Sequence, residues 1–252
     1  MARWHDRWVF AQELSTTTFA VLDVETTGLD PKVDRVVEFA CLRVSAGTVL
    51  ERFASLVDPE GAIPGRASDV HGIFDRDVAG APTLAELAPR IRALTRDAVI
   101  VAHNARFDAS FLPMLAGCAT LCTMRMARRL VDAPSYRNET LRAFLQLETA
   151  RPHARAHRAE ADTDVTAALL LELLRRYERV RSGGTVADLL ATIARPTRLD
   201  RFAFGMHRGK HVAHVPTGYL RWIVASDFES WPDVRHTALI ELARRGCAAS
   251  SA

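Results

Sequence analysis

The stretch that decides the fold reads Phe19-Ala-Val-Leu-Asp-Val-Glu-Thr-Thr-Gly28. Its apolar run indicates a buried β-strand, and the turn residues after it indicate that the strand ends at an exposed edge of a sheet. Side chains alternate across a strand, so Asp23 and Glu25 project from the same face. Two carboxylates this close repel each other, and their apolar neighbours add a desolvation cost. A divalent cation such as Mg²⁺ or Mn²⁺, which prefers oxygen ligands, would remove that conflict.

The segments that follow extend this strand into a larger domain. Further strands are expected over residues 36–44, 49–57 and 98–102. Helices are expected over residues 83–95, 108–115, 138–147 and 161–180, the first of them capped by Thr83 and Glu86. A meander of three strands followed by alternating helix and strand predicts an α/β domain with a mixed sheet.

Two more fragments carry chemistry, namely His103-Asn-Ala-Arg-Phe-Asp108 and His157-Arg-Ala-Glu-Ala-Asp162. Asp108 follows an apolar strand and Asp162 opens the long last helix of the domain, which are places where α/β sheets build their sites. His157 lies in the approach to that helix. Because the ordinary pKa of histidine is about 6.5, a neutral imidazole there is a suitable base for an attacking water.

Each fragment also has a plain structural interpretation. An Asp-x-Glu pair at a strand end is commonly solvated, Asp108 could cap a helix, and Asp162 could serve the helix dipole. A single histidine such as His157 is usually a surface or core residue. For all of these interpretations to hold, the order and spacing of the fragments must be coincidental, so their combination favours a metal-dependent catalytic site.

Together the fragments resemble the motifs of the DEDD superfamily of 3′→5′ exonucleases, in its histidine-containing, DnaQ-like branch. The matching segments are residues 23–28, 103–108 and 157–162, and the similarity covers roughly residues 15–180. The resemblance implies a ribonuclease H-like fold, in which helices flank a mixed five-stranded sheet. It also implies hydrolysis of phosphodiester bonds at the 3′ ends of DNA, with release of nucleoside 5′-monophosphates, in repair or proofreading.

The resemblance further implies roles for individual residues. Two divalent ions, Mg²⁺ or Mn²⁺, would be held by Asp23, Glu25, Asp108 and Asp162, and His157 would take the proton of the attacking water. The residues expected to contact the substrate are Thr26, Thr27, Leu29, His71 and Phe107. Of these, Leu29 would act as an apolar wedge, whereas Phe107 is explained equally well as a core aromatic residue.

The C-terminal part of the chain has a different character, with many aromatic residues and four of the nine histidines. Gly and Pro interruptions place a linker over residues 182–198, between an exonuclease domain (1–181) and a small module (199–252). The module resembles the C-terminal module of exonuclease X, although Met206 stands where that module has a lysine. Its aromatic residues are interpreted as a small core. Its cations are expected to contact nucleic acid, and they are Arg208, Lys210 and His211.

Composition limits the remaining possibilities. About half of the 252 residues are hydrophobic and a quarter are charged, as in ordinary globular proteins. No apolar run approaches the roughly 18 residues that span a membrane, and the N-terminus lacks the pattern of a secretory signal. We therefore expect a cytoplasmic protein with no membrane partner. The cysteines, which lack zinc-site spacing, are interpreted as reduced and mostly buried thiols, and they are Cys41, Cys118, Cys122 and Cys247.

Two other functions stay open at this stage. The chain could be a proofreading subunit within a DNA polymerase assembly, although the nearest approach to a clamp-binding peptide, Gln146-Leu147, falls inside a predicted helix. It could also trim RNA 3′ ends, as RNase T and oligoribonuclease do, because the sequence does not show whether a 2′-hydroxyl is read. The partners expected are single-stranded or 3′-tailed DNA, with a polymerase or a second copy of the chain as further candidates.

Overall fold

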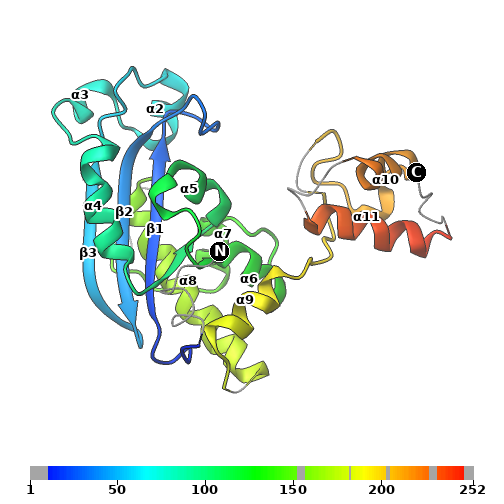
Figure 1. The fold of residues 1–252 in the computed structure, drawn as a ribbon. Helices are drawn as coiled ribbons and strands as arrows, with labels where there is room; N and C mark the ends of the chain where they lie inside the picture. The colour runs from blue at the N-terminus through cyan, green and yellow to red at the C-terminus, as the bar shows by residue number, and fades with distance from the viewer. Residues whose placement is uncertain (1–10, 152–156, 182, 203–204, 227–231, 247–252) are drawn as a thin grey trace. The chain divides into compact units, whose positions relative to one another are not determined.

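A computed structural model describes residues 11–151, 157–181, 183–202, 205–226 and 232–246 of the chain (Figure 1). The chain divides into two compact units, unit 1 (Met1–Thr192) and unit 2 (Ile193–Ala252). Each unit has its own buried core, and each is described by itself below.

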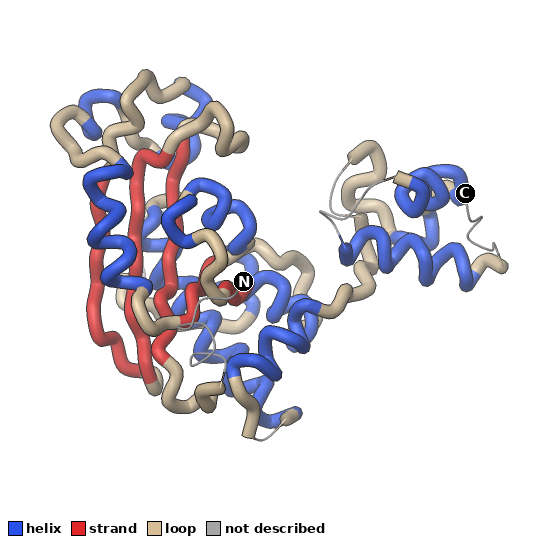
Figure 2. The backbone as a smooth tube through the Cα atoms, viewed as in Figure 1, coloured by secondary structure: helices blue, strands red, loops and turns tan. Residues whose placement is uncertain are grey.

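The described residues of unit 1 form one five-stranded sheet in the order β3-β2-β1-β4-β5 (Figure 2). Its strands are β1 (Thr18–Thr26), β2 (Val36–Ser45), β3 (Thr48–Leu56), β4 (Val99–Ala102) and β5 (Thr120–Cys122). The first three strands pair antiparallel, whereas β4 is parallel to β1 and β5 is parallel to β4. The expected mixed five-stranded α/β fold is confirmed. The sequence pattern missed β5, because a strand of three residues is too short to show a period.

Helices surround this sheet within the described part of unit 1. They are α2 (Gly65–His71), α3 (Asp75–Val78), α4 (Leu84–Thr95), α5 (Ala105–Phe111), the 3₁₀ turn η1 (Pro113–Leu115), α6 (Thr123–Leu130), α7 (Asn138–Phe144), α8 (Ala159–Val180) and α9 (Val186–Ala194). The expected capping box is present in α4: Glu86 donates its backbone N–H to Thr83 Oγ1, and Thr83 N donates to Glu86 Oε2.

The alternation of side chains along β1 decides which face carries the site. Leu22 and Val24 pack in one buried cluster with the apolar residues of α4 and α5. Because successive side chains point to opposite faces, Asp23 and Glu25 face the other side of the sheet. There α8 packs against β1 and β2 (Figure 1). By strand alternation, the two carboxylates point toward the layer that contains Asp162.

Two expected boundaries need correction. Helix α5 begins at Ala105 rather than at Asp108, because Asn104 takes a left-handed conformation (φ 67°) and starts the helix one turn earlier. The linker expected over residues 182–198 instead contains helix α9. This helix belongs largely to unit 1, since Val186 N donates to Gln12 O (3.0 Å) and Leu14 N donates to Gly184 O (3.3 Å). Gly and Pro counts cannot reveal such a partner from the other end of the chain.

Unit 2 contains the 3₁₀ turn η2 (Val212–His214), α10 (Thr217–Ala225) and α11 (Pro232–Arg244). Its core is mostly aliphatic, with Phe202 buried and Tyr219 packed at its margin. The expectation of an aromatic core is wrong for Trp222, whose side chain is 52% exposed. Other aromatic residues of this part lie outside the described residues, and they are Phe204, Phe228 and Trp231.

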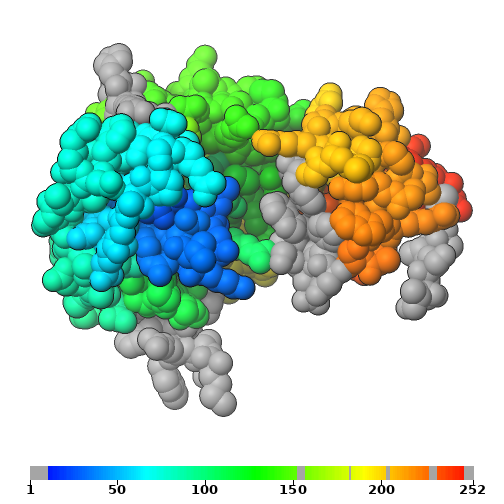
Figure 3. Space-filling model, turned by 90° about the horizontal axis from the view of Figure 1, so that it is seen from above, coloured from blue at the N-terminus to red at the C-terminus, as the bar shows by residue number. Residues whose placement is uncertain are grey.

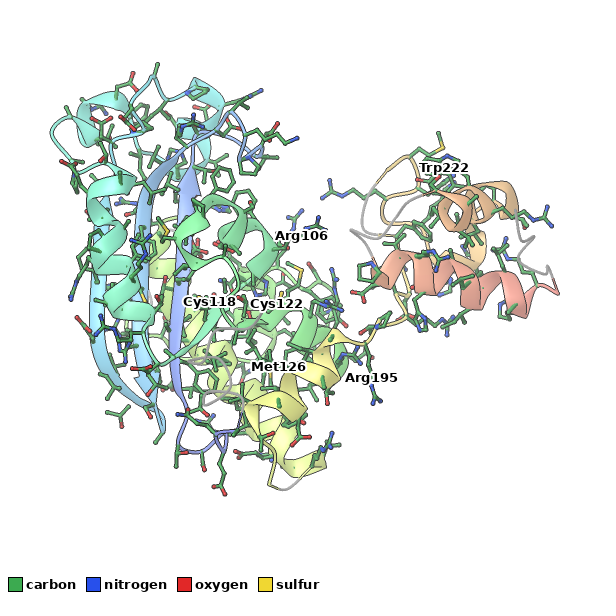
Figure 4. All side chains as sticks on the ribbon, in the orientation of Figure 1. Arg106, Cys118, Cys122, Met126, Arg195 and Trp222 are labelled. Atoms are coloured by element: carbon green, nitrogen blue, oxygen red, sulfur yellow. The ribbon has the colours of Figure 1, made fainter. Side chains whose placement is uncertain are left out.

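The described cysteines are free thiols in unit 1. Cys41 is buried, Cys122 is half-buried and Cys118 is exposed, so the expectation of a buried thiol fails for Cys118. Cys118 and Cys122 are labelled in Figure 4. Cys247 lies outside the described residues. Within the parts of the chain that the structure describes, none of the helices combines the length and the apolar character needed to cross a membrane.

Candidate active site

Carboxylates from β1, α5 and α8 converge on one place in unit 1. Burial raises the pKa of Asp23 well above its usual range, and repulsion from Asp108, Asp162 and Glu25 raises it further. These residues are far apart in the sequence, and the fold brings them within electrostatic range of one another. The structure therefore gathers the acidic residues that the three sequence fragments predicted.

The electrostatics of this cluster favour a bound cation. Burial, followed by repulsion from Asp162, raises the pKa of Glu25 to about 8. Burial also raises the pKa of Asp108 to about 7, although hydrogen bonds from the backbone at Asp108 and Val24 act to lower it. Burial likewise raises the pKa of Asp162. Mg²⁺ and Mn²⁺ prefer carboxylate oxygens as ligands. A bound cation would also offset the repulsion between these crowded carboxylates. The residues present thus fit a divalent metal ion.

The stability of the metal-free protein is expected to fall as pH rises from about 5 to about 8. The folded acids keep protons in this range that the unfolded chain, with carboxyl pKa values of about 4, has already released. Since the folded state binds more protons, each increase in pH favours unfolding. The melting temperature in EDTA should fall across this range, and Mn²⁺ should raise it more at pH 8 than at pH 5.

The substitution Asp108→Asn provides the comparison for that measurement. It removes one buried carboxyl whose pKa is about 7, so the decline in EDTA should become shallower. A wild-type melting temperature that rises with pH in EDTA, or a Mn²⁺ effect that is equal at both pH values, would contradict the assignment of the cluster.

His157 stands at the edge of this cluster and is exposed. One ring nitrogen of His157 and one oxygen each of Glu25 and Asp162 lie within 4.8 Å of one another. The backbone N–H of His157 donates to Asp162 Oδ2 (3.0 Å), while its φ of 58° is left-handed, which is uncommon outside glycine. The residue therefore does two things: its ring faces the acids, and its backbone orients one of them.

Glu38 is a site residue that the sequence analysis missed. It lies on β2 directly opposite Glu25 and is only 4% exposed. Its carboxylate accepts hydrogen bonds from Arg158 Nε (3.1 Å) and Nη2 (2.7 Å) and from Ala159 N (2.9 Å). Glu38 thus fastens the start of α8, between His157 and Asp162, to the sheet. A glutamate inside the apolar run of β2 was the available signal, because a buried charge needs a partner.

Replacing Glu38 with glutamine is expected to lower kcat, or to raise the Mn²⁺ concentration needed for activity, by about 10- to 100-fold. The melting temperature should change little, because two effects oppose each other. The bidentate ion pair with Arg158 is lost, but Glu38 also raises the pKa of both Asp23 and Glu25 by repulsion, and that repulsion is relieved. Kinetics at varied Mn²⁺ together with thermal melts would measure both quantities.

A matched control for Glu38 exists on the same helix. Glu172 pairs with Arg175 and Arg176 on α8, so Glu172→Gln removes a glutamate–arginine network away from the acids. That variant should keep wild-type kinetics. If Glu38→Gln and Glu172→Gln behaved alike, Glu38 would have no positioning role.

His103 and Asn138 build the scaffold around the acids. The carbonyl of Tyr136 accepts from His103 Nε2 (2.8 Å), and His103 Nδ1 lies 2.9 Å from Thr123 Oγ1. Burial lowers the pKa of His103 to about 4, so this imidazole is neutral and joins the end of β4 to α6 and the segment before α7. Asn138 Nδ2 donates to Thr166 Oγ1 (3.0 Å), which ties α7 to α8.

The end of β1 and the loop after it contain three of the predicted substrate contacts. Thr26 Oγ1 donates to Gly28 O (2.6 Å), and Thr27 Oγ1 accepts from Arg35 N (2.9 Å), so both hydroxyls stabilise the loop itself. A Cβ atom at Gly28 would lie 2.4 Å from the Asp34 carboxylate, which accepts from Asp30 N (2.9 Å), so a larger residue would displace Asp34. The blue segment that includes the start of the described chain forms part of the surface in Figure 3. Leu29 is 83% exposed. That exposure is what an apolar wedge needs.

The other predicted contacts are placed differently. His71 is 2% exposed in α2, and its Nδ1 accepts from Ile73 N (3.0 Å) at the end of that helix. Phe107 is half-buried on α5, where its ring centroid lies 5.0 Å from that of Phe111. The three C-terminal cations belong to unit 2.

Several known proteins are similar to this chain in sequence. The exonuclease family model (RNase_T) matches residues 20–170. Exodeoxyribonuclease 10 of Escherichia coli K12 is 33% identical over 221 residues, which cover 86% of this chain and 95% of that protein. The PolC-type DNA polymerase III of Thermotoga maritima is 30% identical over 171 residues, which cover 65% of this chain but only 12% of the polymerase.

Solved structures agree with the sequence comparisons. The structure of exonuclease X in complex with 5′ overhanging duplex DNA has 29% sequence identity and a TM-score of 0.58, and the match covers 69% of this chain and 99% of that one. Exonucleases of this family normally use divalent metal ions. The chain therefore belongs to the RNase T-type exonuclease family and is a 3′→5′ exonuclease, a hydrolase of phosphodiester bonds.

Proposed function

We propose that this chain removes nucleotides from the 3′ ends of DNA as a free-standing repair enzyme of the cytoplasm. The observation that supports the proposal best is the convergence of Asp23, Glu25, Asp108 and Asp162 beside the exposed His157. Two bound divalent ions would activate the attacking water and stabilise the departing 3′-oxygen. The products would be nucleoside 5′-monophosphates.

Each residue has a defined task in this proposal. Glu25 and Asp162 would hold one ion together with Asp23, and Asp108 would reach the second directly or through water. His157 would take the proton of the attacking water, and its exposure lets that proton pass to bulk solvent. Leu29, exposed after β1, would separate the terminal base from its neighbour, with the backbone of Thr26 and Thr27 beside it.

DNA as the substrate, rather than RNA, is supported by the relatives. Exonuclease X was solved with duplex DNA, and exodeoxyribonuclease 10 aligns over nearly its whole length. The coverage also supports a free-standing enzyme, because the polymerase match is confined to 12% of the polymerase. Since 86% of this chain aligns with exodeoxyribonuclease 10, more than unit 1 contains, that match extends into unit 2.

A strand-specific assay tests this function. A 3′-tailed duplex, labelled at the 5′ end of the tailed strand, should be shortened stepwise in Mg²⁺ and left intact in EDTA. Chromatography should identify nucleoside 5′-monophosphates as the products. Matched RNA and DNA single strands in the same assay decide between DNA repair and RNA trimming. Release of the 5′ label as a mononucleotide at the start of the reaction would overturn the proposed direction.

A further inference from the structure

Positive charge is concentrated in unit 2. Residues 193–252 contain nine lysines and arginines against five aspartates and glutamates, while the whole chain has a net charge of only +3. Two of those acids face inward: Glu241, 1% exposed, pairs with Arg244 and Arg245, and Asp233, 6% exposed, accepts from Thr197 N (2.9 Å). Residues 193–252 therefore carry a formal excess of four positive charges, nine minus five.

A tight turn presents part of this charge. Phe202 N donates to Lys210 O (3.0 Å) and Gly209 N donates to Phe202 O (2.8 Å), while Arg208 N donates to Gly205 O (3.0 Å) at the tip. Left-handed Gly205 (φ 71°) and Gly209 (φ 79°) permit the turn. The side chains of Arg208 and Lys210 are exposed, and neither forms an ion pair with the residues that the structure describes.

An exposed aromatic ring is held next to that turn. Trp222 lies on the surface of α10 and is 52% exposed (Figure 4). Its ring centroid is 5.3 Å from that of Tyr219, which in turn is 4.5 Å from that of His207 in the turn. Gly205 also approaches Tyr219 so closely that a Cβ atom would lie 2.6 Å from the phenol oxygen. Tyr219 therefore contacts both the turn and the indole and holds them next to each other.

We propose that this basic aromatic surface, made of Arg208, Lys210 and Trp222, binds single-stranded nucleic acid. The two cations would contact phosphates, and the indole would stack on a base. A single strand fits better than a duplex, because the bases inside a duplex have no free face for the ring. The surface would hold the strand that the active site degrades, so this role rests on the proposed function. The binding of single strands by the surface does not depend on it.

His211 has a different task, although it lies in the same turn. Its Nδ1 accepts from Ala213 N (3.2 Å) and so caps the 3₁₀ turn η2. It is therefore left out of the binding surface, which keeps Arg208 and Lys210, whose side chains are exposed.

Binding is tested with the full chain and a fluorescent (dT)20 oligonucleotide in EDTA, where hydrolysis cannot occur. Fluorescence anisotropy at several salt concentrations should show that Arg208→Ala/Lys210→Ala weakens binding about 10-fold. The slope of log K against log salt should become shallower by about 1.4, or about 0.7 for each lost phosphate contact. Trp222→Ala should weaken binding about 10-fold with the slope unchanged, and Trp222→Phe should restore most of the affinity.

A charge-matched control comes from α4. Arg92→Ala/Arg96→Ala removes the same charge from exposed positions at the end of α4, near the start of β4 and therefore opposite the carboxylate end of β1. This control should bind (dT)20 like the wild type. If the Arg208/Lys210 variant also kept wild-type affinity and slope, the surface would not be a nucleic-acid site.

Hydrolysis separates this inference from the proposed function. With Mg²⁺, the short substrate (dT)3 should be cleaved equally by wild type and surface variants, while the KM for (dT)20 should rise in the variants. An equal loss on both substrates would overturn the proposal of a separate surface. If the wild type bound (dT)20 through these residues but cleaved no DNA, the proposed function would fail and the binding surface would stand.

Discussion

Replacing Asp23 with asparagine is expected to lower the exonuclease rate by about 1000-fold or more and, in EDTA at pH 8, to raise the melting temperature. The rate falls because Asp23 lies at the centre of the acidic cluster, where Asp108, Asp162 and Glu25 all act on it. In the proposed two-metal mechanism Asp23 would hold both ions, so losing its charge would remove several kcal/mol of transition-state stabilisation.

The gain in stability has the same cause as the loss of activity. Asparagine has nearly the shape of aspartate but no charge, so it removes repulsion that the metal-free fold cannot relieve. Relief of about 1–2 kcal/mol corresponds to about 2–6 °C in a protein of this size. With Mn²⁺ present the order should reverse, since the wild type gains the binding energy of the metal and the variant gains little.

Thermal melts with EDTA and with Mn²⁺, alongside the oligonucleotide assay, would measure both effects. Asp69→Asn serves as the control, because Asp69 is exposed on α2. Its substitution makes the same chemical change at another place in unit 1. A variant at Asp23 that kept near-normal turnover would exclude the proposed metal role. A lower melting temperature in EDTA would instead show that Asp23 stabilises the fold through contacts other than charge.

How far the sequence could predict this site depends on the distance between interacting residues. The alternation that puts Asp23 and Glu25 on one face is local, so it follows from the strand pattern alone. The start of α5 depends on one left-handed residue, Asn104, that the helical period does not reveal. The role of Glu38 depends on Arg158, a partner on a distant helix that only the folded chain brings near.

The same reasoning explains why the site residues are predicted better than the architecture around them. Each acidic residue must occupy a fixed position on its own strand or helix. A short sequence fragment is enough to reveal that position. The contacts that orient them join separate elements, as Asn138 joins α7 to α8 and His103 joins β4 to α6. Such contacts have no local pattern. They are also the positions where substitution would impair activity without touching the substrate.

Replacing His157 with asparagine is expected to lower kcat by about 100- to 10,000-fold while the Mn²⁺-induced rise in melting temperature persists. Asparagine removes the proposed base but tolerates the left-handed backbone (φ 58°) that His157 adopts. The backbone N–H can therefore still donate to Asp162 Oδ2, and the ligand keeps its orientation. Single-turnover kinetics would isolate the chemical step from binding.

The comparison with His157→Ala separates the two tasks of this residue. Alanine also removes the base, but it is less tolerant of a left-handed backbone, so it should additionally weaken the support of Asp162 and reduce the Mn²⁺ effect. A third result, loss of the Mn²⁺ effect in both variants, would make His157 a metal ligand, because its ring lies within 4.8 Å of the ligand oxygens of Glu25 and Asp162. Persistence of the Mn²⁺ effect in the asparagine variant alone would show that the backbone of His157 supports Asp162. The loss of kcat in that same variant would then assign the role of base to the imidazole.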